Sequence, residues 1–188
     1  ALAYLEKRGL KDDETIAAHK LGYANRTLGL RLPEKNRLAG AEVRARLQKL
    51  GVLRASGHEH VRGWVVVPIL GADGEVQGLY GRRLITTRPG EAKHLYLPGP
   101  HRGVWNSGGL VGDADVILCE ALLDALTFWA AGFRNVTTAY GVEGFTAAHL
   151  ETLKASGASR VLIAFDRDDA GDRGADAVGK KLLAEGFD

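Results

Sequence analysis

The sequence predicts an α/β protein with two lobes: a basic α+β lobe, then a lobe of βαβ units around a mainly parallel sheet. The first observation is a change of residue period along the chain, from helical spacing to the alternation typical of strands. The second is that, beyond Gly112, short apolar runs alternate with helical stretches of about ten residues, as in a parallel sheet. We therefore divide the chain into residues 1–112 and residues 113–188.

The first lobe is expected to contain three helices and a hairpin. The helical patterns end close to glycines and cover residues 1–8, 12–20 and 41–50. Two apolar runs, 64–70 and 75–80, flank the turn sequence Gly71-Ala-Asp-Gly74, which predicts a pair of strands joined by a tight turn. Residues 23–39 and 86–109 are expected to be irregular.

The second lobe is expected to contain three strands, each followed by a helix. The strands are predicted at residues 116–119, 135–139 and 160–165. The helices are predicted at residues 121–131, 146–155 and 173–185. Gly132 and Gly157 stand where the first two of these helices should end.

Composition excludes several classes of protein. The chain has 188 residues, of which 45% are hydrophobic and 26% charged, with a net charge of +2, so it can form a core and is not disordered. The single cysteine, Cys119, excludes a disulfide framework and a cysteine-built zinc site. There is no long apolar run and no secretory signal, so we expect a cytoplasmic protein. Because methionine is absent and the chain stops directly after a helical pattern, we also expect a piece of a longer protein.

Charge is unevenly divided between the lobes. Residues 1–112 contain 18 Lys and Arg against 10 Asp and Glu, whereas residues 113–188 contain 7 against 13. A basic surface suits phosphate-rich polymers, and an acidic patch suits divalent cations. Together they suggest metal-assisted chemistry on a nucleic acid or nucleotide. Two ordinary solvated surfaces would give the same tally, and composition alone favours neither interpretation.

Three carboxylates directly follow predicted strands. Glu120 comes after the run 116–119, and Asp166 and Asp168 come after the run 160–165. In open α/β sheets, ligands bind beyond the carboxyl ends of the strands. Carboxylates gathered there repel one another unless a cation neutralises them. The sequence therefore predicts that these three acids bind Mg²⁺ or Mn²⁺.

Other acids nearby have more ordinary interpretations. Asp124 lies four residues after Glu120, on the same helical face, where it can join the metal site or hold a basic partner. Asp169 and Asp172 are interpreted as charges that favour the first turn of a helix. Capping remains the competing explanation for each predicted metal ligand.

The tryptophans and the cysteine offer a second set of candidates. Trp64 and Trp129 lie in apolar runs and are expected in the core, as is Cys119. Trp105 lies in a loop region, where core packing and stacking on a base are both open.

The acid-bearing segments resemble the Toprim domain shared by bacterial DnaG-type primases, type IA and type II topoisomerases and some nucleases. The resemblance lies in a glutamate after the first strand, a glycine turn after the second and Asp-x-Asp after the third. The matching segments are residues 117–126, 135–141 and 165–171. The sequence Asp166-Arg-Asp-Asp-Ala-Gly171 favours the primases within this group. Ala121 stands where the family usually has glycine, which hints at a diverged member from a mobile element or phage.

The first lobe is similar, in five segments and in the same order, to the RNA-polymerase core of these primases. The segments are residues 5–10, 61–69, 78–83, 92–96 and 101–105. The resemblance implies that four cations contact nucleic acid or nucleotide opposite the metal site: Arg8, Arg82, Lys93 and Arg102. Surface cations would give the same pattern, and for Arg8 capping of a helix end is equally open. In primases further acids come from a later segment, so we expect the Toprim domain of this chain to be incomplete.

The resemblance implies a primase-like nucleotidyltransferase that makes short RNA primers on single-stranded DNA from nucleoside triphosphates by two-metal catalysis. Glu120, Asp166 and Asp168 would be its catalytic residues. A replicative helicase would be a partner through regions outside this chain, and no membrane partner is expected. Two alternatives are open: a Toprim nuclease or nicking enzyme, with Glu120 as general acid or base, and a non-catalytic module that binds single-stranded nucleic acid.

Overall fold

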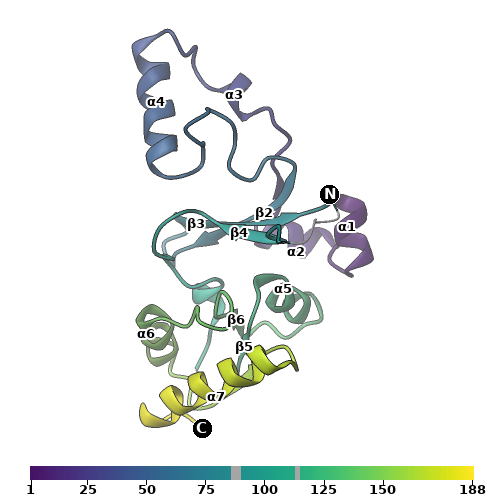
Figure 1. Cartoon of the computed structure of the whole chain (residues 1–188). Coiled ribbons are helices and arrows are strands. Elements are labelled where there is room, and N and C mark those ends of the chain that lie inside the picture. The colour runs from purple at the N-terminus through teal and green to yellow at the C-terminus, as the bar shows by residue number, and fades with distance from the viewer. Residues whose placement is uncertain (86–89, 113–114) are drawn as a thin grey trace.

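The computed structural model describes residues 1–85, 90–112 and 115–188 (Figure 1). It contains an antiparallel sheet with strand order β1-β2-β3-β4 and a parallel sheet with order β6-β5-β7. The strands of the antiparallel sheet are β1 Gly22–Tyr23, β2 Trp64–Leu70, β3 Val76–Arg83 and β4 His94–Tyr96. Those of the parallel sheet are β5 Val116–Cys119, β6 Val136–Thr138 and β7 Val161–Ala164. The predicted mixed α/β class is confirmed.

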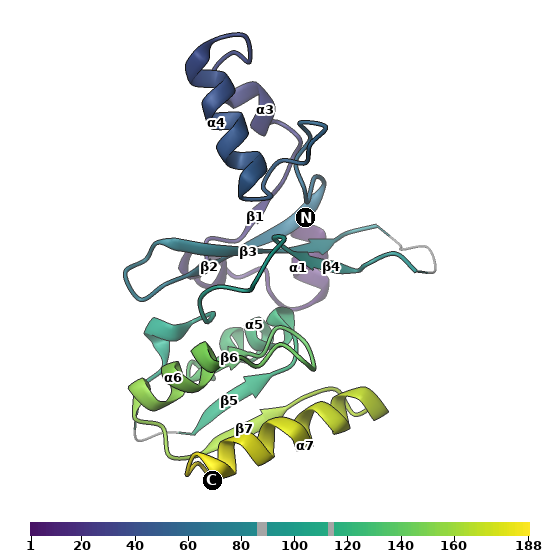
Figure 2. The ribbon, with the colours of Figure 1, turned by 60° about the vertical axis from the view of Figure 1, so that its left-hand side comes forward.

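The helices lie on both sides of the sheets. They are α1 Leu2–Lys7, α2 Asp13–Ala18, α3 Leu28–Arg31, α4 Leu38–Lys49, α5 Leu122–Ala130, α6 Ala147–Ser156 and α7 Asp169–Ala184, with a 3₁₀ turn at Ser107–Gly109. The antiparallel sheet crosses the middle of the molecule, with α3 and α4 projecting from one side and the parallel sheet on the other (Figures 1 and 2). No helix in the described part of the chain is long and apolar enough to cross a membrane.

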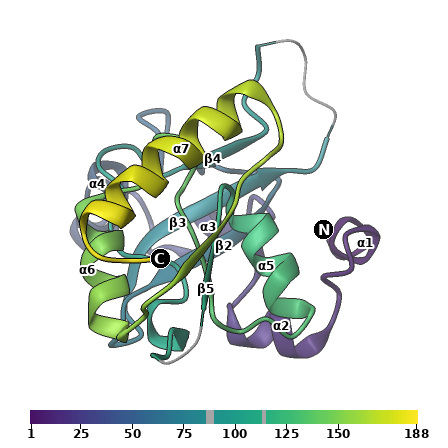
Figure 3. The same cartoon turned by 90° about the horizontal axis from the view of Figure 1, so that it is seen from below.

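Strand β5 separates two layers of helices because its side chains alternate between the faces of the sheet. Ile117 and Cys119 pack into the cluster that contains α5, whereas Val116 and Leu118 pack into the cluster that contains parts of α6 and α7. Seen from below, α5 and α7 lie on opposite sides of β5 (Figure 3).

One hydrophobic core joins the two lobes. Apolar side chains of β2 and β3, including Val67 and Tyr80, belong to the same buried cluster as Leu122 and Leu126 of α5. Helix α5 therefore packs against the antiparallel sheet of the first lobe as well as against the parallel sheet of the second. The predicted boundary near residue 112 stays a proposal, and the packing across it is continuous.

Several predicted elements need correction. Strand β4, helix α3 and strand β1 lie in segments predicted as irregular or at their edge, and each is too short to produce a period in the sequence. Strand β4 is specified by its pairing with the edge of β3. Helix α7 begins at Asp169, four residues before the predicted start, because Asp168 caps it. Helix α4 begins three residues early, at Leu38.

Candidate functional site

The parallel sheet brings two of the predicted acids to one edge. Cys119 of β5 pairs with Ala164 of β7, so the residues that follow these strands leave the sheet side by side. The backbone N–H of Asp166 donates to Oε2 of Glu120 at 3.4 Å. Glu120 is held from the other side by the turn after β6, where Gly141, at φ +103°, donates its N–H to the Glu120 carbonyl at 2.8 Å. The positive φ explains why this turn contains glycine.

Asp168 has a structural role at the same edge. It is the N-cap residue of α7, and its Oδ1 accepts hydrogen bonds from the backbone N–H groups of Ala170 at 3.0 Å and Gly171 at 2.8 Å. Its Oδ2 makes no hydrogen bond to the described residues. Asp168 is therefore the residue that caps α7. Asp169 and Asp172, which were interpreted as first-turn charges, lie in the first turn of α7, and Asp172 pairs with Arg167 at 3.3 Å.

Electrostatics link four carboxylates at this edge. The pKa of Glu120 is raised by burial and by repulsion from Asp166, Asp168 and Asp124, and the Asp166 N–H partly opposes the shift. The pKa of Asp124 is also raised, by burial and by Asp166, while the positive charges of Arg8 and Arg82 oppose the shift. Asp124 is therefore subject to repulsion from an acid of this edge and to attraction from two of the predicted cations.

The carboxylates at this edge suit a divalent cation because of the chemistry of their oxygen atoms. Hard carboxylate oxygens that repel one another are the ligands that Mg²⁺ and Mn²⁺ prefer. Within residues 1–85, 90–112 and 115–188, however, no group of three or more His, Cys, Asp or Glu side chains is arranged closely enough to hold a metal ion. The acids thus form an open set of donors and not a closed cage.

The predicted cations occupy two different places. Arg82 lies on β3 and donates from Nε to Oη of Tyr4 at 3.0 Å, and Arg8 lies over the ring of Tyr4. Lys93 is exposed just before β4, and its carbonyl accepts from the N–H of Arg83. Arg102 instead lines a hollow of about 670 Å³ together with Lys49, residues 96–98, Pro100 and His101.

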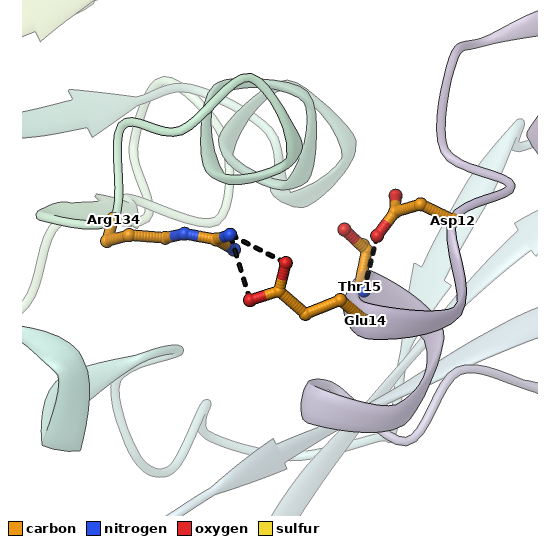
Figure 4. Close-up of polar contacts among 4 residues, drawn as sticks. All are labelled: Asp12, Glu14, Thr15 and Arg134. Carbon is orange, nitrogen blue, oxygen red and sulfur yellow. Dashed lines mark hydrogen bonds and ion pairs between the residues drawn. The ribbon is translucent and has the colours of Figure 1, made fainter.

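The joint between the lobes contains an ion pair, a cation–π contact and packed aromatic rings. Arg134 makes two contacts of 2.9 Å to the carboxylate of Glu14 (Figure 4). On the same helix, Asp12 caps the start of α2 by accepting a hydrogen bond from the backbone N–H of Thr15 (Figure 4). The Arg134 guanidinium also lies 3.5 Å from the ring centre of Trp129. These contacts connect α2 of the first lobe to the segment that follows α5 in the second.

A buried histidine completes the joint. The ring of His19 lies 4.5 Å from the rings of both Trp105 and Trp129, and burial lowers the pKa of His19 to about 4. Trp105 is only 1% exposed. Its role is therefore core packing, and it is not available to stack on a base.

Comparison with known proteins agrees with this arrangement. Residues 117–188 match the family described as Toprim-like. A solved structure of the DnaG catalytic core has a TM-score of 0.80 and 24% identity, covering 97% of this chain and 60% of that one. The DNA primase of Deinococcus radiodurans is 31% identical over 192 residues, which cover 91% of this chain and 31% of that protein. Residues 117–188 are a DnaG-type primase Toprim region.

A second solved structure shows the same fold. The DnaG primase catalytic domain bound to ssDNA has a TM-score of 0.76 and 24% identity, covering 97% of this chain and 61% of that one. The chain spans about a third of the length of the Deinococcus primase. The chain therefore shares the fold of the DnaG catalytic domain.

The departure at Ala121 is harmless to the primase Toprim fold. Ala121 is the N-cap of α5 and has φ −114° and ψ 152°, an extended conformation that any residue adopts. The turn after β5 therefore needs no glycine.

Two residues of the site were missed by sequence reasoning. Tyr4 contacts both Arg8 and Arg82, and the only local signal for it is the four-residue spacing from Arg8 on one helical face. His94 pairs opposite Arg82 in the sheet. The pKa of His94 is lowered by burial and by Arg82, and Asp124 opposes the shift. This pairing depends on the register of a three-residue strand, which the sequence does not reveal.

Substituting Gly171 with alanine should displace Asp166. A Cβ at Gly171 would lie 2.0 Å from the Asp166 carbonyl oxygen, which is backbone and must move. We expect lower stability and weaker Mn²⁺ binding, although glycine to alanine inside a helix usually stabilises by up to about 1 kcal/mol. Gly179→Ala is the matched control in α7, because its Cβ would meet only Ile163 Cδ1 at 3.7 Å. Equal Mn²⁺ affinity in the two variants would contradict the prediction.

Replacing Asp124 with asparagine should stabilise the chain at neutral pH. Because the folded-state pKa of Asp124 is raised, its ionisation destabilises the fold, and stability falls as pH rises through the window just above the ordinary Asp range. We expect a gain of about 0.5 kcal/mol after solvent screening, or about 1–2 °C in the thermal midpoint. The gain should vanish near pH 4.

Asp169→Asn is the control for this experiment. Asp169 is an exposed acid in the first turn of α7, so its loss should slightly lower the thermal midpoint. A lower midpoint for the Asp124 variant at pH 7 would show that the attraction of Asp124 to the positive charges of Arg8 and Arg82 outweighs the cost of its burial.

Proposed function

We propose that the chain is the catalytic core of a primase, a DNA-directed RNA polymerase that makes short RNA primers on single-stranded DNA. The observation that carries the proposal is that Asp124 is repelled by Asp166 of one lobe and attracted by Arg8 and Arg82 of the other. In this proposal the acids form a cation site, and the two arginines form a phosphate site close to it. Nucleotidyl transfer needs both, because the reacting triphosphate must be held and its charge neutralised.

The acids would hold the metal ions. Glu120, Asp166 and the free Oδ2 of Asp168 would be the ligands, with Asp124 as a further candidate. Bound Mg²⁺ or Mn²⁺ would supply charge neutralisation at the triphosphate and activation of the primer 3′ hydroxyl. The capping bonds of Asp168 fix its carboxylate against α7, so that the ligand is oriented before binding.

The cations would hold the nucleic acid and the nucleotide. Arg82 and Arg8 lie near the acidic edge and suit the phosphates of the nucleic acid as well as those of the incoming triphosphate, since guanidinium groups bind phosphate in a bidentate manner. Lys93, exposed beside β4, and Arg102, in its separate hollow with Lys49, suit the template backbone. A DnaG relative of the same fold is described as bound to ssDNA, which supports single-stranded DNA as the template.

Further acids of the full-length protein would be added at the outer side of β7, which faces away from β5. Val161 donates to the carbonyl of Asp188, and Asp188 donates to the carbonyl of Ser159, both at 2.9 Å. This is the hydrogen-bond pattern of a parallel pair. We propose that acids from another part of the full-length protein complete the site from this side, and that the protein works in the cytoplasm with a replicative helicase.

The proposal is tested by the product formed on single-stranded DNA. Full-length protein is incubated with circular single-stranded DNA, labelled ribonucleoside triphosphates and Mg²⁺. A primase incorporates label into short RNA that alkali destroys. Nicked or linearised circles without incorporated label would indicate a Toprim nuclease, and retarded but unchanged circles would indicate a binding module. Either of those results would overturn the proposal.

A further inference from the structure

Tyr4 connects two of the proposed phosphate-binding cations. Its hydroxyl accepts a hydrogen bond from Nε of Arg82 at 3.0 Å, across 78 positions of sequence. Its ring lies under the guanidinium of Arg8, whose Cζ is 5.4 Å from the ring centre. The ring itself packs against the core shared by the two lobes, so it is a fixed point for both side chains.

The contact leaves the binding end of Arg82 available. Nε is the donor nearest the main chain, so its use by Tyr4 leaves the two terminal nitrogens, which form the fork that binds phosphate. In the part of the chain that the structure describes, neither Arg8 nor Arg82 forms an ion pair with a carboxylate. Arg83 differs, because it pairs with Glu91 at 2.6 Å and lies over the ring of Trp64.

Fixing an arginine before binding raises its affinity for phosphate. A free arginine side chain loses rotamer freedom when it binds, and this loss of entropy opposes binding. Arg82 is already restrained by the sheet at one end and by Tyr4 at Nε. Part of this entropy is therefore lost on folding and not on binding.

We propose that Tyr4 is a positioning residue for phosphate recognition, orienting Arg82 through its hydroxyl and Arg8 through its ring. This inference rests on the proposed function, in which these two arginines bind phosphate. It assigns to the first helix of the chain a part in forming the site, although Tyr4 itself contacts neither metal nor substrate.

The test compares Tyr4→Phe with Arg82→Ala in the full-length protein. The probe is a fluorescent oligodeoxythymidine, and its dissociation constant is measured over a series of salt concentrations. Tyr4→Phe keeps the ring under Arg8 and removes only the hydroxyl, so we expect about five-fold weaker binding with an unchanged salt slope. Arg82→Ala removes a charge, so we expect weaker binding and a salt slope smaller by about one.

Two further measurements separate positioning from folding. The thermal midpoint of Tyr4→Phe should lie close to that of the unsubstituted protein. The Nε–H resonance of Arg82 should exchange faster with water in that variant, because its hydrogen bond is lost. If Tyr4 were merely structural, the thermal midpoint of Tyr4→Phe would fall instead.

The outcomes distinguish the two proposals. If Arg82→Ala weakens binding and Tyr4→Phe does not, the positioning role of Tyr4 is overturned and the proposed function stands. If neither substitution changes the affinity or the salt slope, the assignment of the phosphate surface fails, and the role of Tyr4 fails with it.

Discussion

Replacing Asp166 and Asp168 together with asparagine is expected to abolish primer synthesis by the full-length protein, with a loss of about 1000-fold or more. The expected effect is large because groups that hold catalytic cations act as a unit. Asparagine preserves the volume of each side chain, and at position 168 it preserves a good helix cap. The loss should therefore come from charge and ligation and not from unfolding.

The control for this experiment is Asp172→Asn. Asp172 lies in the first turn of the same helix and pairs with Arg167 on the exposed surface. It changes the net charge near the site without touching a proposed ligand. We expect nearly full activity, as measured by labelled RNA. Comparable activity in the double variant and the control would show that the two aspartates only cap and solvate α7.

Replacing Trp105 with alanine is expected to lower the free energy of unfolding by about 3–5 kcal/mol. Trp105 is 1% exposed, and its backbone connects the lobes: its N–H donates to Tyr140 Oη at 2.8 Å, and its carbonyl accepts from Thr137 Oγ1 at 2.6 Å. Its ring stacks against His19. The substitution should therefore leave a cavity at the joint.

Urea unfolding followed by two probes measures this effect. Because one core joins the lobes, the loss should shift a single transition that is coincident by circular dichroism and by tryptophan fluorescence. Leu30→Ala, at a side chain 85% exposed, should leave the midpoint almost unchanged. Two separate transitions, with only one of them shifted, would show that the lobes unfold independently.

The elements that sequence predicted best are those with the strongest local signals. β2 and β5 match their predicted bounds, since each is an unbroken apolar run flanked by turn residues. β4 is three residues long, and its existence depends on the edge of β3, which lies elsewhere in the sequence. The start of α7 was missed because several neighbouring acids could have been its cap.

The residues of the candidate site also fall into two groups, those that the sequence predicts and those that long-range packing determines. The order of parallel strands is enough to place Glu120 beside Asp166, since both follow strands that pair. Nothing local predicts that Tyr4 contacts Arg82, because that contact depends on how α1 packs against the sheet. Trp105 illustrates the limit most simply: its surrounding loop left core packing and base stacking both open, and the packing of both lobes, which buries it, decides between them.

Titration of the chain with Mn²⁺ in a calorimeter tests the central claim, that the acids at the ends of β5 and β7 form a metal site. The measurement compares the unsubstituted chain with the Asp166→Asn/Asp168→Asn variant, and needs neither template nor product. We predict saturable binding by the unsubstituted chain and its loss in the variant. Equal binding by both, whether strong or weak, would contradict the claim.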